Sequence, residues 1–200
     1  MGKPVAVPSA CMAVFRYKFM PAGIMHRSTY QEQEFARRAF YGGRVDTFKL
    51  MYDFPPGTYA KYCDVTSEYP YVNASKLYPR GEPRWMMQWD MNKYQRQMDE
   101  GRFSIGSLSN TTIRSAKDEY GPKMLLEVDV DCPSSLYIPL LPEKRNGKLV
   151  FDLLPKRKQV YTNDELAWAI SLGYRVIKIH GGLLWDTSTN QLFRKYMDTF

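Results

Sequence analysis

The stretch from Lys123 to Asp131 constrains the fold most strongly, because apolar and acidic residues alternate along it. A period of two residues is that of a β-strand with one buried face. One face would carry Leu126, Val128 and Val130, and the other Glu127, Asp129 and Asp131. The sequence therefore predicts a half-buried strand whose acidic face is solvated.

Two stretches have the spacing of a helix capping box, in which a side-chain oxygen accepts a hydrogen bond from a backbone amide three residues later. Ser28 to Gln31 predicts a helix that runs to about Phe40 and stops at Gly42–Gly43. Thr162 to Glu165 predicts a second helix, which ends at Gly173.

Between and after these helices the chain alternates between turns and extended segments. Arg145 to Gly147 predicts the turn of a hairpin-like region that spans Leu136 to Leu154, and Tyr174 to Ile179 predicts a strand. The basic cluster Lys156–Lys158 is expected to be solvated, and residues 86–120 are expected to be polar and irregular.

A further strand is predicted in the first third of the chain. Arg44 to Tyr52 is expected to be extended, Phe54 to Gly57 to turn, and Thr58 to Thr66 to alternate as a strand. This strand would end near Asp64 and would make Cys63 a packed residue.

The last residues, from Thr189, have the pattern of an amphipathic helix that ends at Phe200. Its apolar face is expected to pack on a partner outside this chain. With the other elements, this predicts an α+β fold with antiparallel strands and flanking helices.

Composition limits the chemistry that the chain can perform. The 200 residues are 44% hydrophobic and 24% charged, as in an ordinary globular domain. The histidines are His26 and His180, and the cysteines Cys11, Cys63 and Cys132 have neither disulfide nor zinc-ligand spacing. Catalysis would therefore depend on carboxylates.

The charge balance favours a polyanionic partner. Lys and Arg number 28 against 21 Asp and Glu, which gives a net charge of +7 and attraction for nucleic acid. The sequence has no apolar run of membrane-spanning length and no secretory signal pattern, so we expect a soluble, intracellular protein with no membrane partner.

The most informative residues are Asp64 to Pro70, followed by Tyr71 to Asn73 and then Arg80 to Pro83. This series resembles motif A of family B DNA polymerases, in which an aspartate closes a palm strand and Tyr-Pro follows. Glu68 stands where the family usually has leucine. The continuation is similar to the protein-primed branch of viruses, linear plasmids and Polinton-type elements. Upstream, Phe40 to Arg44 resembles the Tyr-x-Gly-Gly motif of the same family.

The resemblance assigns roles to the motif A residues. Asp64 would be the catalytic carboxylate and would bind Mg²⁺ or Mn²⁺ together with the Val65 carbonyl, because hard cations prefer oxygen ligands. The backbone amides of Ser67 and Glu68 would face the phosphates of the incoming nucleotide. Tyr69 would pack against its sugar.

The resemblance also implies contacts with DNA. The residues that would grip single-stranded template are Phe40, Tyr41, Gly42, Gly43 and Arg44, through ring stacking, close backbone approach and phosphate contact. The expected partners are a DNA primer-template, a dNTP and a terminal or priming protein.

The implied architecture is a partial polymerase palm with an insertion region. Residues 1–57 would link to the palm, residues 58–85 would form the palm strand and motif A, and residues 86–200 would form the palm insertion and a connector toward the fingers. No motif B follows motif A. A second polypeptide could carry motifs B and C.

Two places imitate motif C, which supplies the second catalytic aspartate of the family. Asp129-Val-Asp131 lies on a solvated strand face, and Tyr196-Met-Asp198-Thr-Phe200 lies in a helical pattern with Phe200 in place of the second aspartate. We reject both. The sequence thus predicts a palm fragment that is inactive alone, with a non-catalytic DNA-binding or priming-protein-binding module as the alternative.

Overall fold

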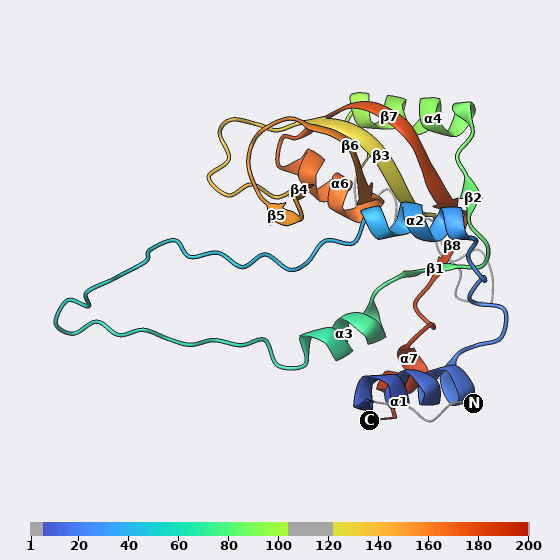
Figure 1. The fold of residues 1–200 in the computed structure, drawn as a ribbon, viewed down its shortest axis with the longest axis horizontal. Coiled ribbons are helices and arrows are strands. Elements are labelled where there is room, and N and C mark those ends of the chain that lie inside the picture. The colour runs from blue at the N-terminus through green and yellow to red at the C-terminus, as the bar shows by residue number, and fades with distance from the viewer. Residues whose placement is uncertain (1–5, 104–121, 200) are drawn as a thin grey trace.

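The computed structural model describes residues 6–103 and 122–199. Its largest part is a four-stranded antiparallel sheet in the order β2-β7-β3-β6. Figure 1 shows this sheet in the upper half of the molecule, with the chain termini together at the bottom. The strands are β2 (Arg84–Trp85), β3 (Lys123–Asp131), β6 (Lys156–Thr162) and β7 (Arg175–Trp185).

The core lies on one face of this sheet. Leu126, Val128 and Val130 of β3 are fully buried, so the predicted alternation is confirmed. The acidic face is not solvated as predicted, because Glu127 and Asp129 are only partly exposed and contact Arg38 and His180. Their core partners come from α4 (Gln88–Asp99) and α6 (Asn163–Ser171), which contribute Tyr94, Met98, Leu166 and Ala169. The helix α4 occupies part of residues 86–120, which were expected to be irregular, and that prediction is wrong for Gln88–Asp99.

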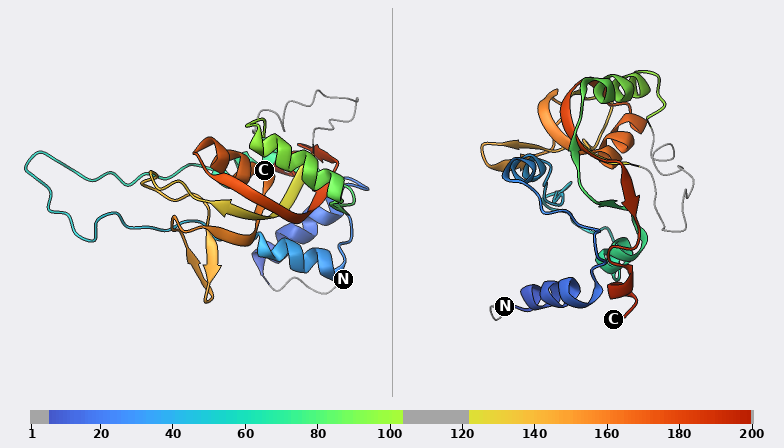
Figure 2. Two further views of the ribbon diagram at one scale, coloured as in Figure 1. Left: turned by 90° about the horizontal axis from the view of Figure 1, so that it is seen from above. Right: turned by 90° about the vertical axis from the view of Figure 1, so that its right-hand side faces the viewer.

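Helix α2 (Tyr30–Arg38) lies on the other side of the sheet from α4 and α6, as the right-hand view of Figure 2 shows. It begins at a capping box formed by Thr29 and Glu32, one residue later than predicted. The second predicted capping box, Thr162 with Glu165, is confirmed at the start of α6. Both caps are local hydrogen bonds, which explains why the sequence reveals them.

The hairpin formed by β4 (Glu143–Arg145) and β5 (Lys148–Val150) has its turn at Asn146–Gly147, as predicted. Both turn residues have positive φ, 51° for Asn146 and 74° for Gly147, which is the conformation that tight hairpin turns require.

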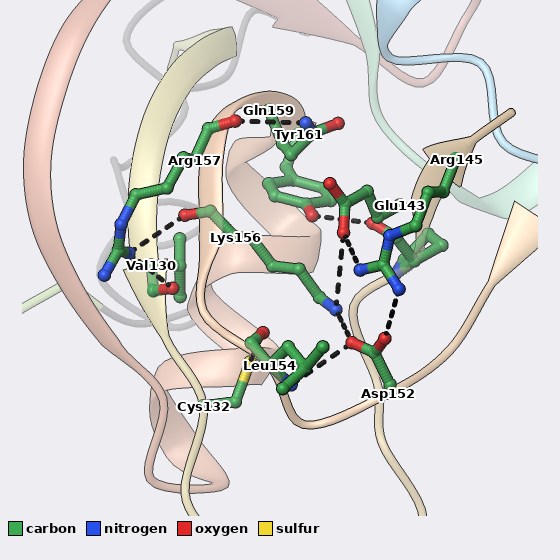
Figure 3. A network of polar contacts seen from close by, with 11 residues as sticks. Val130, Cys132, Glu143, Arg145, Asp152, Leu154, Lys156, Arg157, Gln159 and Tyr161 are labelled. Carbon is green, nitrogen blue, oxygen red and sulfur yellow. Dashed lines mark hydrogen bonds and ion pairs between the residues drawn. The ribbon is translucent and has the colours of Figure 1, made fainter.

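Behind the hairpin, Lys156 is fully buried, so the prediction that the whole Lys156–Lys158 cluster is solvated is wrong for this residue. Figure 3 shows its amine directed at the carboxylates of Asp152 and Glu143. Arg145 closes the network by donating to Asp152 (2.9 Å) and Glu143 (2.6 Å). Arg157 and Lys158, by contrast, are exposed.

A second, smaller core joins the two ends of the chain. It contains Phe15 and Ile24 from the first residues and Leu192 from the last. Phe193 and Tyr196 pack their rings on Phe15, with centroids 4.9 and 5.9 Å away. The helical elements here are α1 (Val7–Val14), η1 (Phe15–Phe19) and the short α7 (Arg194–Met197). The predicted terminal helix is therefore shorter than expected, and its apolar face packs inside this chain rather than on an external partner.

Strands β1 (Tyr78–Arg80) and β8 (Thr187–Thr189) pair with each other and connect this small core to the sheet. Arg84 lies at the junction, where its guanidinium donates to both carboxylate oxygens of Asp90 at 2.6 and 3.0 Å. It also reaches Asp186 at 3.3 Å.

Residues 45–65 form a long excursion with two extended limbs, which Figure 1 shows at the left of the molecule. The predicted strand Thr58–Thr66 is absent, because none of the strands in the described parts of the chain pairs with either limb. A backbone hydrogen bond from Thr58 to Pro55 closes the turn between the limbs. Cys63, expected to be packed, is exposed.

None of the helices within residues 6–103 and 122–199 combines the length and the apolar character that crossing a membrane requires.

The packing around β7 gives a direct test of the sheet. A methyl group at Gly182 would lie 2.4 Å from the Leu125 carbonyl oxygen, whereas one at Gly181 would meet nothing within 4 Å. We expect Gly182→Ala to lower the free energy of unfolding by about 1–3 kcal/mol and Gly181→Ala to leave it nearly unchanged. Urea denaturation of both variants measures this difference, and equal effects would contradict the strand register described here.

Candidate active site

The candidate site is built on the turn that precedes helix α3 (Glu68–Ser75). Ser67 is the N-cap residue and has left-handed backbone angles, φ 55° and ψ 33°, which are unfavourable for a residue with a side chain. Its side chain makes no capping hydrogen bond. The amides of the first helical turn therefore lack a side-chain cap, and such amides attract anions.

Next to this turn is a pocket of about 620 Å³. One wall consists of the motif A residues Val65–Glu68 and Pro70–Val72 together with Ala74. Met197 and Asp198, at the end of α7, also line the pocket. Arg194 of the same helix lies 3.5 Å from the Asp198 carboxylate. The fold thus brings one of the two rejected motif C imitations beside motif A, while its last residue, Phe200, lies outside the described residues.

Asp64, the predicted catalytic and metal-binding residue, is exposed at the end of the second limb, directly before this turn. Within the parts of the chain that the structure describes, no cluster of three or more His, Cys, Asp or Glu could hold a metal ion. Asp64 and the Val65 carbonyl are oxygen donors of the kind that magnesium prefers, but they supply only part of a six-ligand shell. The described residues alone therefore do not form a complete metal site.

Tyr69 and Tyr78 differ in their surroundings. Tyr69 projects from α3 with 83% of its surface exposed. Tyr78, beyond the end of the helix, donates a hydrogen bond from its hydroxyl to Asn73 Oδ1 (2.9 Å) and packs edge-on against Phe193. Burial raises the pKa of the Tyr78 hydroxyl. Its hydrogen bond to Asn73 and its contact with Phe193 attach α3 to the small core.

The residues of the Tyr-x-Gly-Gly motif lie away from this pocket, against the β4–β5 hairpin and α6. Tyr41 stacks on Tyr161 with ring centroids 5.5 Å apart, and burial raises its pKa to about 12. Gly42 lies beside Leu149, Gly43 has open space around its α-carbon, and Phe40 remains 69% exposed.

Arg44 is held within the chain by several contacts. Its guanidinium donates to the Pro139 carbonyl (2.5 Å) and to Asp46 (2.6 Å), and it lies over the Phe151 ring. Tyr41, Gly42 and Arg44 line a mainly apolar pocket of about 640 Å³ together with the loop 136–140. The sequence revealed the motif but not this pocket, because the loop is nearly a hundred residues further along the chain.

The fold is similar to that of a known DNA polymerase. The structure is similar to that of phi29 DNA polymerase in complex with primer-template DNA and incoming nucleotides, with a TM-score of 0.52 and 15% sequence identity. The match covers 96% of this chain and 31% of that polymerase, so the chain spans about a third of its length. At this identity the likeness establishes the fold, and it confirms the predicted α+β architecture with antiparallel strands and flanking helices.

The family follows from the sequence model that matches residues 3–200, whose description is DNA polymerase type B, organellar and viral. The chain belongs to this family, as the motif A residues predicted. No curated protein matches it.

The Tyr-x-Gly-Gly geometry leads to a paired test. We expect Tyr41→Ala to lower the free energy of unfolding by about 2 kcal/mol, because it removes a half-buried ring from its stack on Tyr161. Phe40→Ala removes a mostly exposed ring and should change stability by less than about 0.5 kcal/mol. Thermal unfolding of the two variants measures the difference, and equal losses would show that Tyr41 has no special structural role.

Proposed function

We propose that this chain is part of the palm of a protein-primed type B DNA polymerase and takes part in metal-dependent nucleotidyl transfer during DNA replication. The observation that carries the proposal is the Asp64–Pro70 segment, in which an exposed aspartate precedes a left-handed Ser67 turn and the uncapped start of α3. A carboxylate followed by free amides is what a metal-bound triphosphate needs. Membership of the polymerase family supports the same assignment.

In this proposal each motif A residue has one task. Asp64 and the Val65 carbonyl would hold Mg²⁺ or Mn²⁺, and the bound cation would neutralise phosphate charge. The amides of Ser67 and Glu68 contact the triphosphate of a dNTP, and Tyr69 packs against its sugar. Glu68 adds a negative side chain beside that ligand, so the metal's charge is all the more necessary for binding.

Residues 1–57 then lead into the palm, residues 58–85 carry its motif A strand and turn, and residues 86–200 form its insertion. The sheet of β2, β3, β6 and β7 belongs mainly to the insertion, which we assign to contacts with primer-template DNA and a terminal protein. Phe40 and Gly43 are the residues of the Tyr-x-Gly-Gly motif that remain accessible to template, since Tyr41 and Arg44 already have partners within the chain.

The limb that carries Asp64 has no strand beside it among the described residues, and Asp64 has no acidic cluster around it. A two-metal mechanism requires a second carboxylate. We therefore infer that a strand with motif C, and a helix with motif B, act together with this chain and come from a separate segment or polypeptide.

Primer extension tests this proposal. The purified chain should not extend a primed template with Mg²⁺ or Mn²⁺, whereas a mixture with a polypeptide that carries motifs B and C should do so. Asp64→Ala should abolish that extension, because it removes a metal ligand. The control Asp53→Ala, on the same excursion, should keep it.

Extension that survives Asp64→Ala would contradict the role of Asp64. Salt-dependent DNA binding that is indifferent to both Asp64→Ala and magnesium, without extension in any mixture, would favour the alternative of a non-catalytic binding module.

A further inference from the structure

We propose that Tyr78 is a positioning residue for the motif A turn, because it fixes the helix whose first amides would meet the incoming nucleotide. The inference rests on the proposed function for the role of these amides. It concerns a residue outside the Asp64–Pro70 segment, and it assigns that residue to the orientation of the site rather than to contact with the substrate.

Helix α3 has few means of fixing its own direction. It is eight residues long, Glu68–Ser75, and isolated helices shorter than about 12 residues are marginal in water. Ser67 gives it no side-chain cap, and none of its residues is buried. The limb that precedes it pairs with none of the strands in the described parts of the chain. The direction of α3 therefore depends on contacts with elements that are distant from its first turn.

Tyr78 supplies such a contact at the other end of the helix. Its hydroxyl donates to Asn73 Oδ1 at 2.9 Å, and the Val72 carbonyl oxygen lies 3.4 Å from the same hydroxyl. Asn73 and Ala74 are the two residues of α3 that are partly buried. Tyr78 thus holds α3 at the part of the helix that lies against the rest of the chain.

Tyr78 is itself held from two directions. Its ring packs edge-on against Phe193, with centroids 5.0 Å apart, and Phe193 packs in turn on Phe15 of the small core. Its backbone belongs to β1, which follows α3 directly in Figure 1, and there it is the cross-strand partner of Thr189 on β8. A side chain fixed by both the small core and the β1–β8 ladder is a rigid support for the helix.

The motif A turn moves together with this helix. The Tyr71 amide donates to the Ser67 carbonyl at 2.9 Å, so Ser67 is tied to the first turn of α3. Asn73 lies about 7.5 Å from Glu68 along the helix axis. The pocket of about 620 Å³ beside the turn leaves room for movement. Loss of the support at Asn73 would therefore let α3 tilt and would displace the amides of Ser67 and Glu68, and a displacement of about 1 Å in a site is costly.

Hydrogen exchange on the purified chain tests the support itself. Tyr78→Phe keeps the ring on Phe193 and removes only the hydroxyl, and we expect it to speed the exchange of the amides of residues 71–76 about tenfold. The matched control Tyr17→Phe removes an exposed tyrosine hydroxyl from η1 and should leave this exchange unchanged. Thermal unfolding should show that both variants fold like the parent chain.

Steady-state kinetics tests the consequence for the site. In a mixture with a polypeptide that carries motifs B and C, Tyr78→Phe should raise the KM for dNTP about tenfold and change kcat by less than about twofold, because the amides would hold the triphosphate throughout the reaction. Simple loss of folded chain would instead lower kcat and leave KM unchanged. The double variant Asn73→Ala/Tyr78→Phe should have the KM of Tyr78→Phe alone, because both changes remove the same hydrogen bond.

The outcomes separate this inference from the proposed function. Unchanged exchange in Tyr78→Phe would overturn the inference whether or not the mixture extends a primer. Faster exchange with the parent KM would also overturn it, because Tyr78 would then hold α3 without any effect on the nucleotide. If the mixture with the parent chain extends no primer, the proposed function fails, and the inference fails with it even where exchange is faster.

Discussion

The position of the candidate site depends on the guanidinium of Arg84. The Arg84 guanidinium donates to both carboxylate oxygens of Asp90, which is 1% exposed. Asp90 also caps α4 by accepting a hydrogen bond from the Met87 amide. The hydrogen bonds from Arg84 hold the pKa of Asp90 below its usual value. Because Arg84 also reaches Asp186, between β7 and β8, one side chain fixes the sheet relative to the β1–β8 ladder. That ladder leads directly to α3 and the motif A turn.

The parts of the fold that could be predicted from sequence are those set by near neighbours. The alternation along β3, the capping boxes and the Asn146–Gly147 turn each depend on residues only a few positions apart. One carboxylate partner of Lys156, Asp152, is only four residues away. The burial of Lys156 also depends on how the β4–β5 hairpin folds back and brings Glu143 close, and this could not be predicted from near neighbours. The prediction of a strand at residues 58–66 was wrong although its local pattern is suitable, because a strand also needs a neighbouring backbone to pair with.

In the candidate site, too, the features set by near neighbours could be predicted and those that depend on distant residues could not. The Val65–Glu68 turn and the helix after it are local, and the motif indicated their position. The proximity of Asp198 to that turn depends on α7, which the stacking of Phe193 and Tyr196 on Phe15 holds in place. That contact joins residues at opposite ends of the chain. The engagement of Arg44 by Pro139 is equally long-range, so the motif alone suggested a free arginine.

The two limbs of residues 45–65 affect the tendency of the chain to self-associate. They expose Val45, Leu50 and Tyr62 almost completely, and their backbones are extended without strand partners among the described residues. Extended, apolar and unpaired segments act as templates for the addition of further strands. The excursion that carries Asp64 therefore has the properties of an unprotected sheet edge. A partner that covered it would complete the site and would also prevent self-association.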